Sequence, residues 1–120
     1  MPGNPIVHIE FSAQDRVALG NFYAELFGWK VEQIPEMNYA SFEAQEGFGG
    51  GFNPVSENYP AGTTMAYIGV EDIVATLVRV EAMGGRTLAP KSEIPGFGWY
   101  AVFSDLSGNK VGLYTAMRPR

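Results

Sequence analysis

The chain contains one histidine, His8, and a glutamate follows it two positions later, at Glu10. Residues two apart on a β-strand point to the same side, so a strand through this stretch would place the imidazole and the carboxylate together. An imidazole changes charge near neutral pH and can bind a metal ion, so His8 is a candidate general base or ligand contact. The alternative is a cavity-wall histidine that is hydrogen-bonded to Glu10 or to a tyrosine. No second catalytic group is visible in the sequence, which favours a binding or structural role.

Glu10 also has two roles open to it. Beside apolar cavity walls its carboxyl group could act as an acid or a base. It could equally pair with Lys110, if that lysine faces the same cavity. The sequence does not choose between these roles.

Other catalytic patterns are missing from the sequence. There is no cysteine, which excludes disulfides and thiolate metal sites and makes a cytoplasmic location the expectation. No Gly-x-Ser-x-Gly elbow accompanies the single histidine, which argues against a serine nucleophile. The glycine-rich stretches 47–51 and 96–98 lack the strand-to-helix context of a phosphate-binding loop, so tight bends explain them better.

Composition limits the class of protein. At 120 residues, with 46% hydrophobic and 13% aromatic content, the chain suits one domain with a substantial core. No run of 18 apolar residues occurs, and no signal-peptide pattern opens the sequence, so we expect no membrane partner. The net charge is −5, the pI is about 4.7 and there is no basic cluster, which argues against nucleic acid as a partner.

The first half predicts a strand, a helix and three more strands. Alternation at 6–11 predicts a strand with one apolar face and with His8 and Glu10 on the other face. Asp15 is placed to cap the helix that follows, and Gly28 is placed to end it. The apolar stripe predicted to face the sheet is Leu19, Phe22, Tyr23 and Leu26. The further strands are predicted at 29–34, 39–44 and 49–53.

The second half repeats this plan from Met65. At an offset of 57 residues Asp15 aligns with Asp72, and Gly28 aligns with Gly85, without gaps. The predicted elements are a strand at 65–70, a helix with Ile73, Leu77 and Val80 on its buried stripe, and strands near 86–89, 98–104 and 110–115. The polar segment 54–62, which has two prolines, would link a first module of about 5–53 to a second of about 63–116.

This repetition predicts an α+β fold of two tandem βαβββ modules with curved sheets enclosing a cavity. One face of each sheet would lie under a helix and the other would face the cavity. Alternation turns Met65 and Tyr67 toward the cavity, and likewise Tyr114 on the final strand. For 98–104 the pattern allows either Tyr100 with Val102 or Trp99 with Phe103 on the cavity side. The predicted ligand-binding residues are His8, Glu10, Met65, Tyr67, Trp99 and Tyr114.

These features resemble the vicinal oxygen chelate superfamily, which includes glyoxalases, bleomycin-resistance proteins and extradiol dioxygenases. The matching motifs are His8 ahead of Asp15, Phe22-Tyr23, Phe27-Gly28-Trp29, Val70-Glu-Asp72, Gly84-Gly85, and Asp105-Leu-Ser-Gly108-Asn109 leading to Gly112-Leu113-Tyr114. The pattern Ile94-Pro-Gly-Phe-Gly-Trp99 is similar to that of small bacterial glyoxalase-like proteins. The resemblance covers nearly the whole chain, and it implies a fold that carries many chemistries.

The resemblance implies one metal ligand on each of four cavity-facing strands. Those positions fall on His8, near Gly51, on Met65 and on Gly112. Only the imidazole is a good ligand for a divalent ion such as zinc, nickel, iron or manganese. We therefore expect no cofactor and no metal site, with a divalent metal held at His8 as the alternative.

Three functions follow from the resemblance and from these departures. The leading expectation is a glyoxalase/bleomycin-resistance-like protein that binds a small molecule in an aromatic cavity without the family metal. The alternatives are a metal-dependent lyase, isomerase or dioxygenase that uses His8, and a non-catalytic interaction subunit. The catalytic residues are unknown at this level. The resemblance also implies a homodimer.

Overall fold

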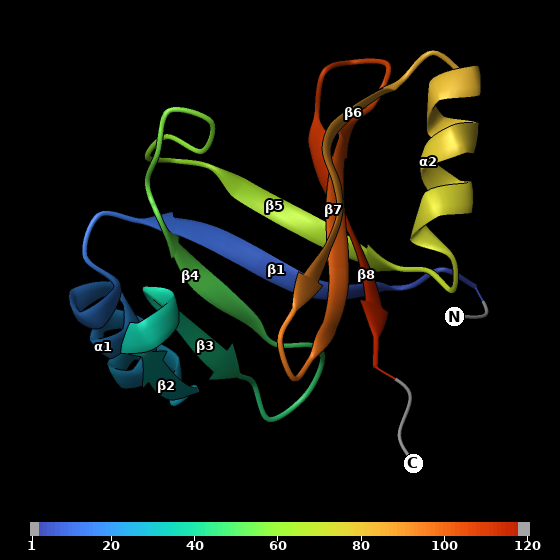
Figure 1. Ribbon diagram of the computed structural model, residues 1–120. Helices are drawn as coiled ribbons and strands as arrows, with labels where there is room; N and C mark the ends of the chain where they lie inside the picture. Colours follow the sequence, from blue (N-terminus) through green and yellow to red (C-terminus); the bar gives the residue numbers. More distant parts are fainter. Residues whose placement is uncertain (1–2, 118–120) are drawn as a thin grey trace. The chain divides into compact units, whose positions relative to one another are not determined.

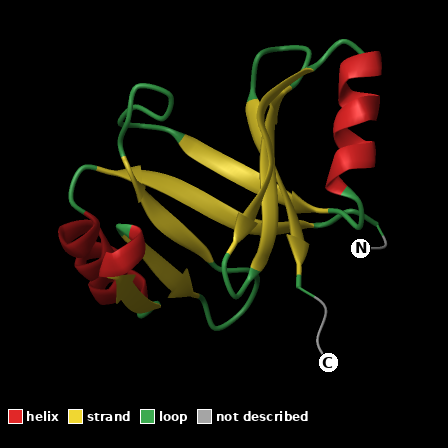
Figure 2. Cartoon of the chain, in the orientation of Figure 1, coloured by secondary structure: helices red, strands yellow, loops and turns green. Residues whose placement is uncertain are grey.

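The computed structural model describes residues 3–117 and confirms an α+β fold in which the βαβββ unit occurs twice (Figures 1 and 2). Residues 8–65 form one compact unit, and residues 66–117 together with the first residues through Val7 form the other. We call the unit around the first four strands module one and the unit around the last four strands module two. Within the described residues, no helix is long and apolar enough to cross a membrane.

Module one has a four-stranded mixed sheet with the strand order β2-β3-β4-β1. Its elements are β1 (Ile6–Ala13), α1 (Arg16–Phe27), β2 (Lys30–Ile34), the 3₁₀ turn η1 (Pro35–Met37), β3 (Tyr39–Glu43) and β4 (Gly50–Pro54). β1 runs parallel to β4, with Glu10 opposite Gly51, and the other neighbours are antiparallel. Two parallel strands need a long connection between them, and α1, β2 and β3 form this connection between β1 and β4.

Module two repeats this topology with the strand order β6-β7-β8-β5. Its elements are β5 (Thr64–Gly69), α2 (Ile73–Ala82), β6 (Arg86–Ile94), β7 (Gly98–Ser104) and β8 (Lys110–Ala116). β5 runs parallel to β8, with Tyr67 opposite Gly112, which is the same relation as that between Glu10 and Gly51. The register thus confirms the duplication that the sequence predicts.

Both predicted helix starts are confirmed. The Asp15 carboxylate accepts hydrogen bonds from the backbone N–H groups of Val17 at 3.1 Å and Ala18 at 3.0 Å. Asp72 accepts from the N–H of Ala75 at 3.0 Å. Each cap satisfies donors that have no partner within the helix, which is worth about 1 kcal/mol per helix. At the other end of α1, Gly28 has the left-handed conformation (φ 74°) that ends a helix.

The core of module one is a stack of aromatic rings between α1 and the sheet. Phe42 lies 4.4 Å from Trp29 between ring centroids, and Tyr23 lies 5.2 Å from Trp29, both nearly parallel. Phe52 is fully buried beneath them. Such pairs add roughly 0.5–1.5 kcal/mol each beyond the burial of their area, so the side chains on this face of the sheet stabilise its packing against α1.

The predicted stripe of α1 is only partly right. Leu19 and Tyr23 pack on the sheet, but Phe22 and Leu26 are 56% and 58% exposed. The reason is Gly20, which is buried and faces Val31 of β2 so closely that a Cβ there would lie 2.9 Å from the valine. Because α1 meets the sheet at Gly20, residues two and six positions later turn away from it.

The core of module two lies under α2. Ile73 and Leu77 from the helix are buried against Ala101 and Leu113, as the predicted stripe requires. Trp99 and Phe103 pack against the same cluster and therefore lie on the helix side of the sheet. This resolves the open alternation in β7, because Tyr100 and Val102 must then lie on the opposite face.

Strand β6 is longer than predicted and runs through Pro90 to Ile94. It is the edge strand of its sheet, and its pairing with β7 shifts register on both sides of Ala89. A proline has no N–H for the sheet, so an edge strand with a bulge can hold it where a central strand could not. The prediction ended this strand at Ala89, just before the proline.

Candidate functional site

On module one, the sheet face away from α1 carries a network of four polar side chains. His8 and Glu10 come from β1, as their spacing predicts, and Tyr39 and Asn53 come from β3 and β4. The register brings them together, because Ala40 pairs with Phe52 in the core and the residues beside this pair therefore point to the other face.

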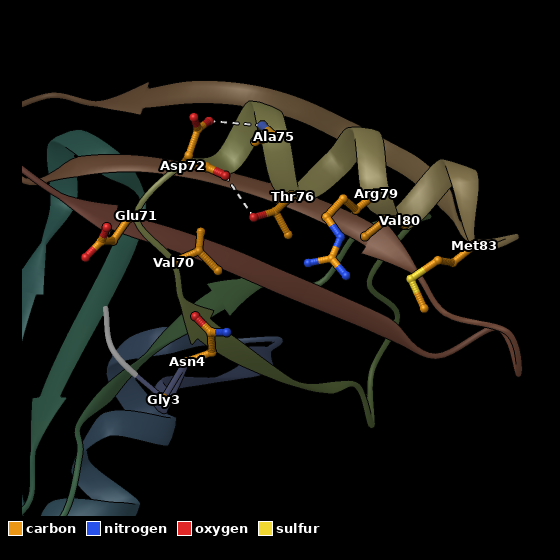
Figure 3. Close-up of a pocket in the computed structure, with 10 residues that line it drawn as sticks. All are labelled: Gly3, Asn4, Val70, Glu71, Asp72, Ala75, Thr76, Arg79, Val80 and Met83. Atoms are coloured by element: carbon orange, nitrogen blue, oxygen red, sulfur yellow. Dashed lines mark hydrogen bonds between the residues drawn. The ribbon is translucent and has the colours of Figure 1, made fainter.

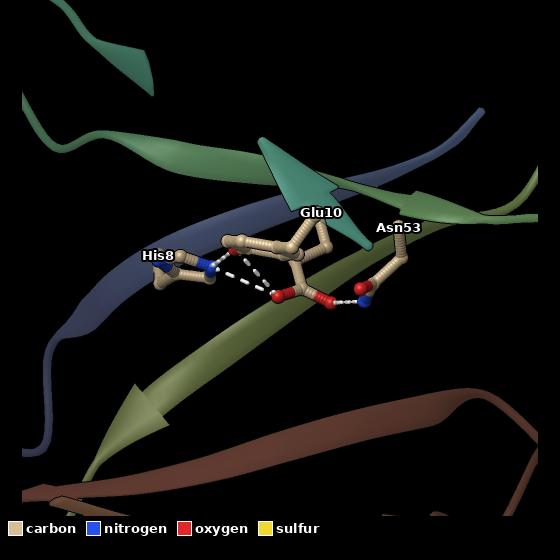
Figure 4. A network of polar contacts seen from close by, with 4 residues as sticks. His8, Glu10 and Asn53 are labelled. Atoms are coloured by element: carbon tan, nitrogen blue, oxygen red, sulfur yellow. Dashed lines mark hydrogen bonds and ion pairs between the residues drawn. The ribbon is translucent and has the colours of Figure 1, made fainter. Parts of the chain in front are cut away.

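Glu10 is the centre of this network (Figure 4). Its Oε2 atom accepts a hydrogen bond from the Tyr39 hydroxyl at 2.9 Å and lies 3.1 Å from Nε2 of His8. Its Oε1 atom accepts from the side-chain amide of Asn53. The Glu10 side chain is 12% exposed and that of His8 is 31% exposed. The carboxylate is therefore mostly enclosed by donors, whereas the imidazole remains partly accessible.

The contacts of His8 indicate which ring nitrogen carries the proton. Nε2 lies 3.1 Å from a carboxylate oxygen and 3.0 Å from the hydroxyl of Tyr39. Because that hydroxyl donates to Glu10, a lone pair on Nε2 would face two acceptor oxygens. A proton on Nε2 satisfies both contacts, and we assign it there from the network. In the neutral ring the lone pair then belongs to Nδ1.

Tyr39 is held in place by a glycine. Its ring and hydroxyl lie where a side chain on Gly51 would begin. Any other residue at this position of β4 would push the tyrosine away from His8 and Glu10. Because Gly51 has no side chain, it leaves the space that Tyr39 occupies in the network.

Module two carries an aromatic surface on the corresponding face. The ring of Tyr67 covers Gly112, its partner on β8, as the ring of Tyr39 covers Gly51. Tyr114 is partly buried, which raises its pKa above the usual value, and its hydroxyl donates to the carbonyl of Phe97 at 3.1 Å. Tyr100 lies opposite Tyr114 in the antiparallel pair of β7 and β8.

The repeat makes the two faces comparable position by position. The chain offset and the strand registers align His8 with Met65, Glu10 with Tyr67, Tyr39 with Tyr100, Asn53 with Tyr114, and Gly51 with Gly112. The polar network of module one therefore has a methionine and three tyrosines as its counterpart in module two. The glycine is common to both, and so is the tyrosine at positions 39 and 100.

The predicted ligand-binding residues have different outcomes. His8 and Glu10 are brought together, and the hydrogen bond between them is one that the sequence suggested for a cavity-wall histidine. Tyr67 and Tyr114 lie on the face away from α2, but Tyr67 is buried, as is Met65, and only Tyr114 of the two tyrosines is partly exposed. Trp99 packs on the helix side instead, with Nζ of Lys91 5.1 Å from its ring centroid, so its placement does not match a role in lining a cavity.

Sequence reasoning missed Tyr39 and Asn53. Both lie at an end of a predicted strand, where alternation says least about orientation. The available signal was the glycine run at 49–51, since a glycine on a central strand often marks a close approach of another group.

Comparison with known proteins identifies the family. The glyoxalase-like domain family matches residues 8–114, which is nearly the whole chain. The chain belongs to the glyoxalase-like family. A glyoxylase-like domain-containing protein from Didymella fabae is 30% identical over 115 residues, covering 89% of this chain and 90% of that protein.

Two further comparisons agree with this family. A Mycobacterium bovis protein with the provisional name glyoxylase CFP32 is 26% identical over 92% of this chain, although the chain spans only 45% of that relative. A glyoxalase/bleomycin resistance protein/dioxygenase superfamily member from Vibrio splendidus has a similar fold, with a TM-score of 0.68 at 15% identity over 93% of this chain and 98% of that one. The glyoxalase-like chain thus has the fold of the vicinal oxygen chelate superfamily.

The residues of this glyoxalase-like chain do not fit the metal that the superfamily resemblance implies. Across residues 3–117, no three His, Cys, Asp or Glu side chains lie close enough together to hold a metal ion. Of the four expected ligand positions, two are glycines covered by tyrosine rings, at Gly51 and Gly112. The other two are His8 and Met65, an imidazole and a thioether. This is a poor donor set for a divalent ion that prefers nitrogen and oxygen ligands.

Module two also has an open groove of about 700 Å³ between α2 and the N-terminal segment (Figure 3). It contains none of the predicted ligand-binding residues; it is lined by Gly3, Asn4, Val70, Glu71, Asp72, Ala75, Thr76, Arg79, Val80 and Met83. Asp72 caps α2, and the Thr76 hydroxyl donates to the Asp72 carbonyl at 2.8 Å. Part of its polar lining is therefore engaged in forming the helix terminus, and the network on module one is the stronger candidate site.

Proposed function

We propose that this glyoxalase-like protein binds a small molecule through His8 and Glu10 on the helix-free face of module one, without the family metal. One observation carries this proposal. Three positions that module two fills with methionine and tyrosine hold His8, Glu10 and Asn53 in module one, and these three form a connected polar network with Tyr39. The fold is built in both cases, so it does not require a carboxylate at the centre of this face.

The energetic cost of the network supports a role in binding. A carboxylate that is 12% exposed loses much of its hydration, and only a full set of donors offsets that loss. Glu10 has three donors in His8, Tyr39 and Asn53. A packed apolar surface would be an easier solution for stability alone, as module two illustrates. The network is best explained by a polar group of a ligand that meets it.

The donor set supports a metal-independent mode of binding. Glu10 and Tyr39 hold His8 through its Nε2 atom, and Gly51 has no side chain that could bind a metal ion. Tyr114 remains a candidate contact for a flat ligand on module two, since tyrosine faces stack well on planar groups, whereas Tyr67 is buried against Gly112.

The proposal is tested by a thermal-shift screen of cationic and neutral aromatic compounds, followed by titration of each hit. We expect a ligand whose affinity falls at least about tenfold in Glu10→Gln and in His8→Ala, since each removes a polar contact in a poorly hydrated site. Glu32→Gln is the matched control, because Glu32 is an exposed carboxylate on β2 of the same sheet, outside the network. A screen without hits, or hits unaffected by both variants, would count against the proposal.

Elemental analysis tests the metal-independent part separately. We expect the protein purified without added metal, and then incubated with nickel, zinc, iron or manganese, to hold far less than about one ion per chain. Stoichiometric metal that is lost in His8→Ala would instead favour a metal-dependent enzyme.

A further inference from the structure

We infer that the groove on module two is a second binding site and that it takes a monocarboxylate with an apolar chain. Arg79 and Asn4 bind the carboxylate from opposite walls, and the chain lies over the apolar lining between them. All of the described lining belongs to module two, so this inference stands apart from the proposed function of module one.

The groove has room for such a molecule. Its volume of about 700 Å³ lies within the range of sites that bind small molecules. One wall is α2, and the other is the segment that leads into β1 (Figure 3). That segment is tied to β5, because the carbonyl of Pro5 accepts a hydrogen bond from the N–H of Gly69 at 2.8 Å. The second wall is therefore attached to the same module that α2 covers.

Arg79 supplies the positive charge of the groove. Within residues 3–117 its guanidinium donates no hydrogen bond and forms no ion pair, and Figure 3 shows it directed from α2 into the groove. Its planar set of N–H donors matches the two oxygens of a carboxylate. The charge of Arg79 also favours the last turn of α2, where it lies. That effect does not require the side chain to turn into the groove, whereas binding an anion does.

Asn4 supplies a hydrogen-bonding group on the opposite wall. Its backbone is left-handed (φ 45°) and follows Gly3, which is also left-handed (φ 78°). Asparagine adopts this conformation more readily than most residues, so the bend in the segment can carry a polar side chain. The Asn4 amide makes no hydrogen bond within the described part of the chain. Its N–H groups can therefore donate to a carboxylate oxygen that Arg79 also contacts.

The rest of the lining suits an apolar chain. Val70 is 7% exposed, Val80 is half-buried and Met83 is 70% exposed, so apolar lining runs from the core of module two to its surface. A methionine side chain is unbranched and adapts to the shape of a ligand. Covering it with a hydrocarbon chain removes apolar area from water, which favours binding.

Acidic residues select against a second negative charge on the ligand. Asp72 and Glu71 line the groove near the start of α2. Asp72 and Arg79 are seven residues apart, which is roughly 10 Å along a helix. A single carboxylate at Arg79 lies away from this acidic end, but a dicarboxylate that spans the groove would bring its second charge close to Asp72. The favoured ligand is therefore a monoanion.

The test is titration with octanoate, followed by isothermal titration calorimetry. We expect roughly one octanoate per chain, bound with a Kd on the order of 1 mM. Octan-1-ol lacks the charge and octanedioate carries a second one, so each should bind at least about fivefold more weakly. Hexanoate should also bind about fivefold more weakly, because it buries two fewer CH₂ groups.

Variants locate the octanoate on the protein. Arg79→Gln should weaken binding by about fivefold, and Asn4→Ala by about threefold. Arg79→Lys keeps the charge at the end of α2 but cannot form two parallel bonds, so it should keep the unfolding temperature and still lose affinity. Arg86→Gln is the matched control, because Arg86 is an exposed arginine on β6 outside the groove.

Three results would overturn the inference. One is no binding signal up to about 10 mM octanoate. Another is equal affinity for octanoate and octan-1-ol, or an affinity that is unchanged in Arg79→Gln. The third is an octanoate affinity that falls in Glu10→Gln but not in Arg79→Gln, which would place the ligand on module one. Circular dichroism and thermal unfolding establish that each variant is folded, and Arg79→Lys gives the same decision if Arg79→Gln is unstable.

Discussion

In module one the helix-free face of the sheet holds Glu10 among three hydrogen-bond donors, whereas the same face of module two holds three tyrosines and a buried methionine. The strand order, the parallel closing pair and the capped helix are the same in both modules. The difference shows that the same strand order forms with different residues on this face. One feature is shared by the two faces: Gly51 and Gly112 each lie against a tyrosine ring.

The largest expected effect tests whether the glycines that lie against tyrosine rings are needed for stability. A Cβ at Gly112 would lie against the root of the Tyr67 ring, including its Cγ atom, which cannot move without rotating the whole side chain. We expect Gly112→Ala to lower the free energy of unfolding by about 3 kcal/mol, the upper range for overpacking. Urea unfolding followed by tryptophan fluorescence measures this. A change below about 0.5 kcal/mol would show that the contact between Gly112 and the Tyr67 ring can accommodate a methyl group.

A smaller loss of stability but a larger loss of function is expected at the matching glycine. At Gly51 the obstructing atoms belong to the outer end of the Tyr39 ring, which can swing away. Gly51→Ala should therefore cost about 1–2 kcal/mol, mainly through the lost hydrogen bonds of the tyrosine. It should also weaken ligand binding, because displacing Tyr39 removes its contacts with His8 and Glu10. Equal stability losses at both glycines, with unchanged binding in Gly51→Ala, would remove the distinction between the modules.

The same contrast explains what the sequence could and could not predict. Duplication, helix caps and the shared face of His8 and Glu10 depend on spacing along the chain, and all of these are confirmed. The contribution of Tyr39 depends on the register between strands, which no local pattern determines. Register is set by packing on the far side of the sheet, here by the pairing of Ala40 with Phe52.

The pattern left one orientation open and assigned another wrongly, in both cases for apolar residues. Strand β7 has large side chains on both faces, so alternation alone could not place Trp99. Phe22 satisfies a helical stripe, yet the close approach of α1 at Gly20 turns it outward. In both cases packing between the helix and the sheet decides which face a residue occupies.

A direct exchange between the modules sharpens the comparison further. His8→Met introduces the residue that module two has at the equivalent position, Met65. Glu10 would keep its contacts with Tyr39 and Asn53 and lose one donor, so we expect a stability loss of about 1 kcal/mol. Ligand binding should be lost. A variant that unfolds, or one that still binds the ligand, would show that the two positions are not equivalent.

The smallest effect concerns acid sensitivity, which should arise in module two away from both helix-free faces. Asp105 accepts hydrogen bonds from the side-chain amide and the backbone N–H of Asn109, both at 2.9 Å, and from the N–H of Ser107. These bonds lower the pKa of Asp105 below its ordinary value, and the bond from the Asn109 side chain makes the largest contribution.

A carboxyl group with a lower pKa in the folded state adds stability above its unfolded pKa, and this stability is lost as the pH falls through the folded pKa. Asp105→Asn should therefore lower the denaturation midpoint at neutral pH and show a smaller further decrease below about pH 4 than the unmodified protein. If both proteins lose stability in parallel on acidification, the acid-sensitive groups lie elsewhere, and Glu81, whose pKa is lowered by its hydrogen bond from Thr87, is the next residue to replace.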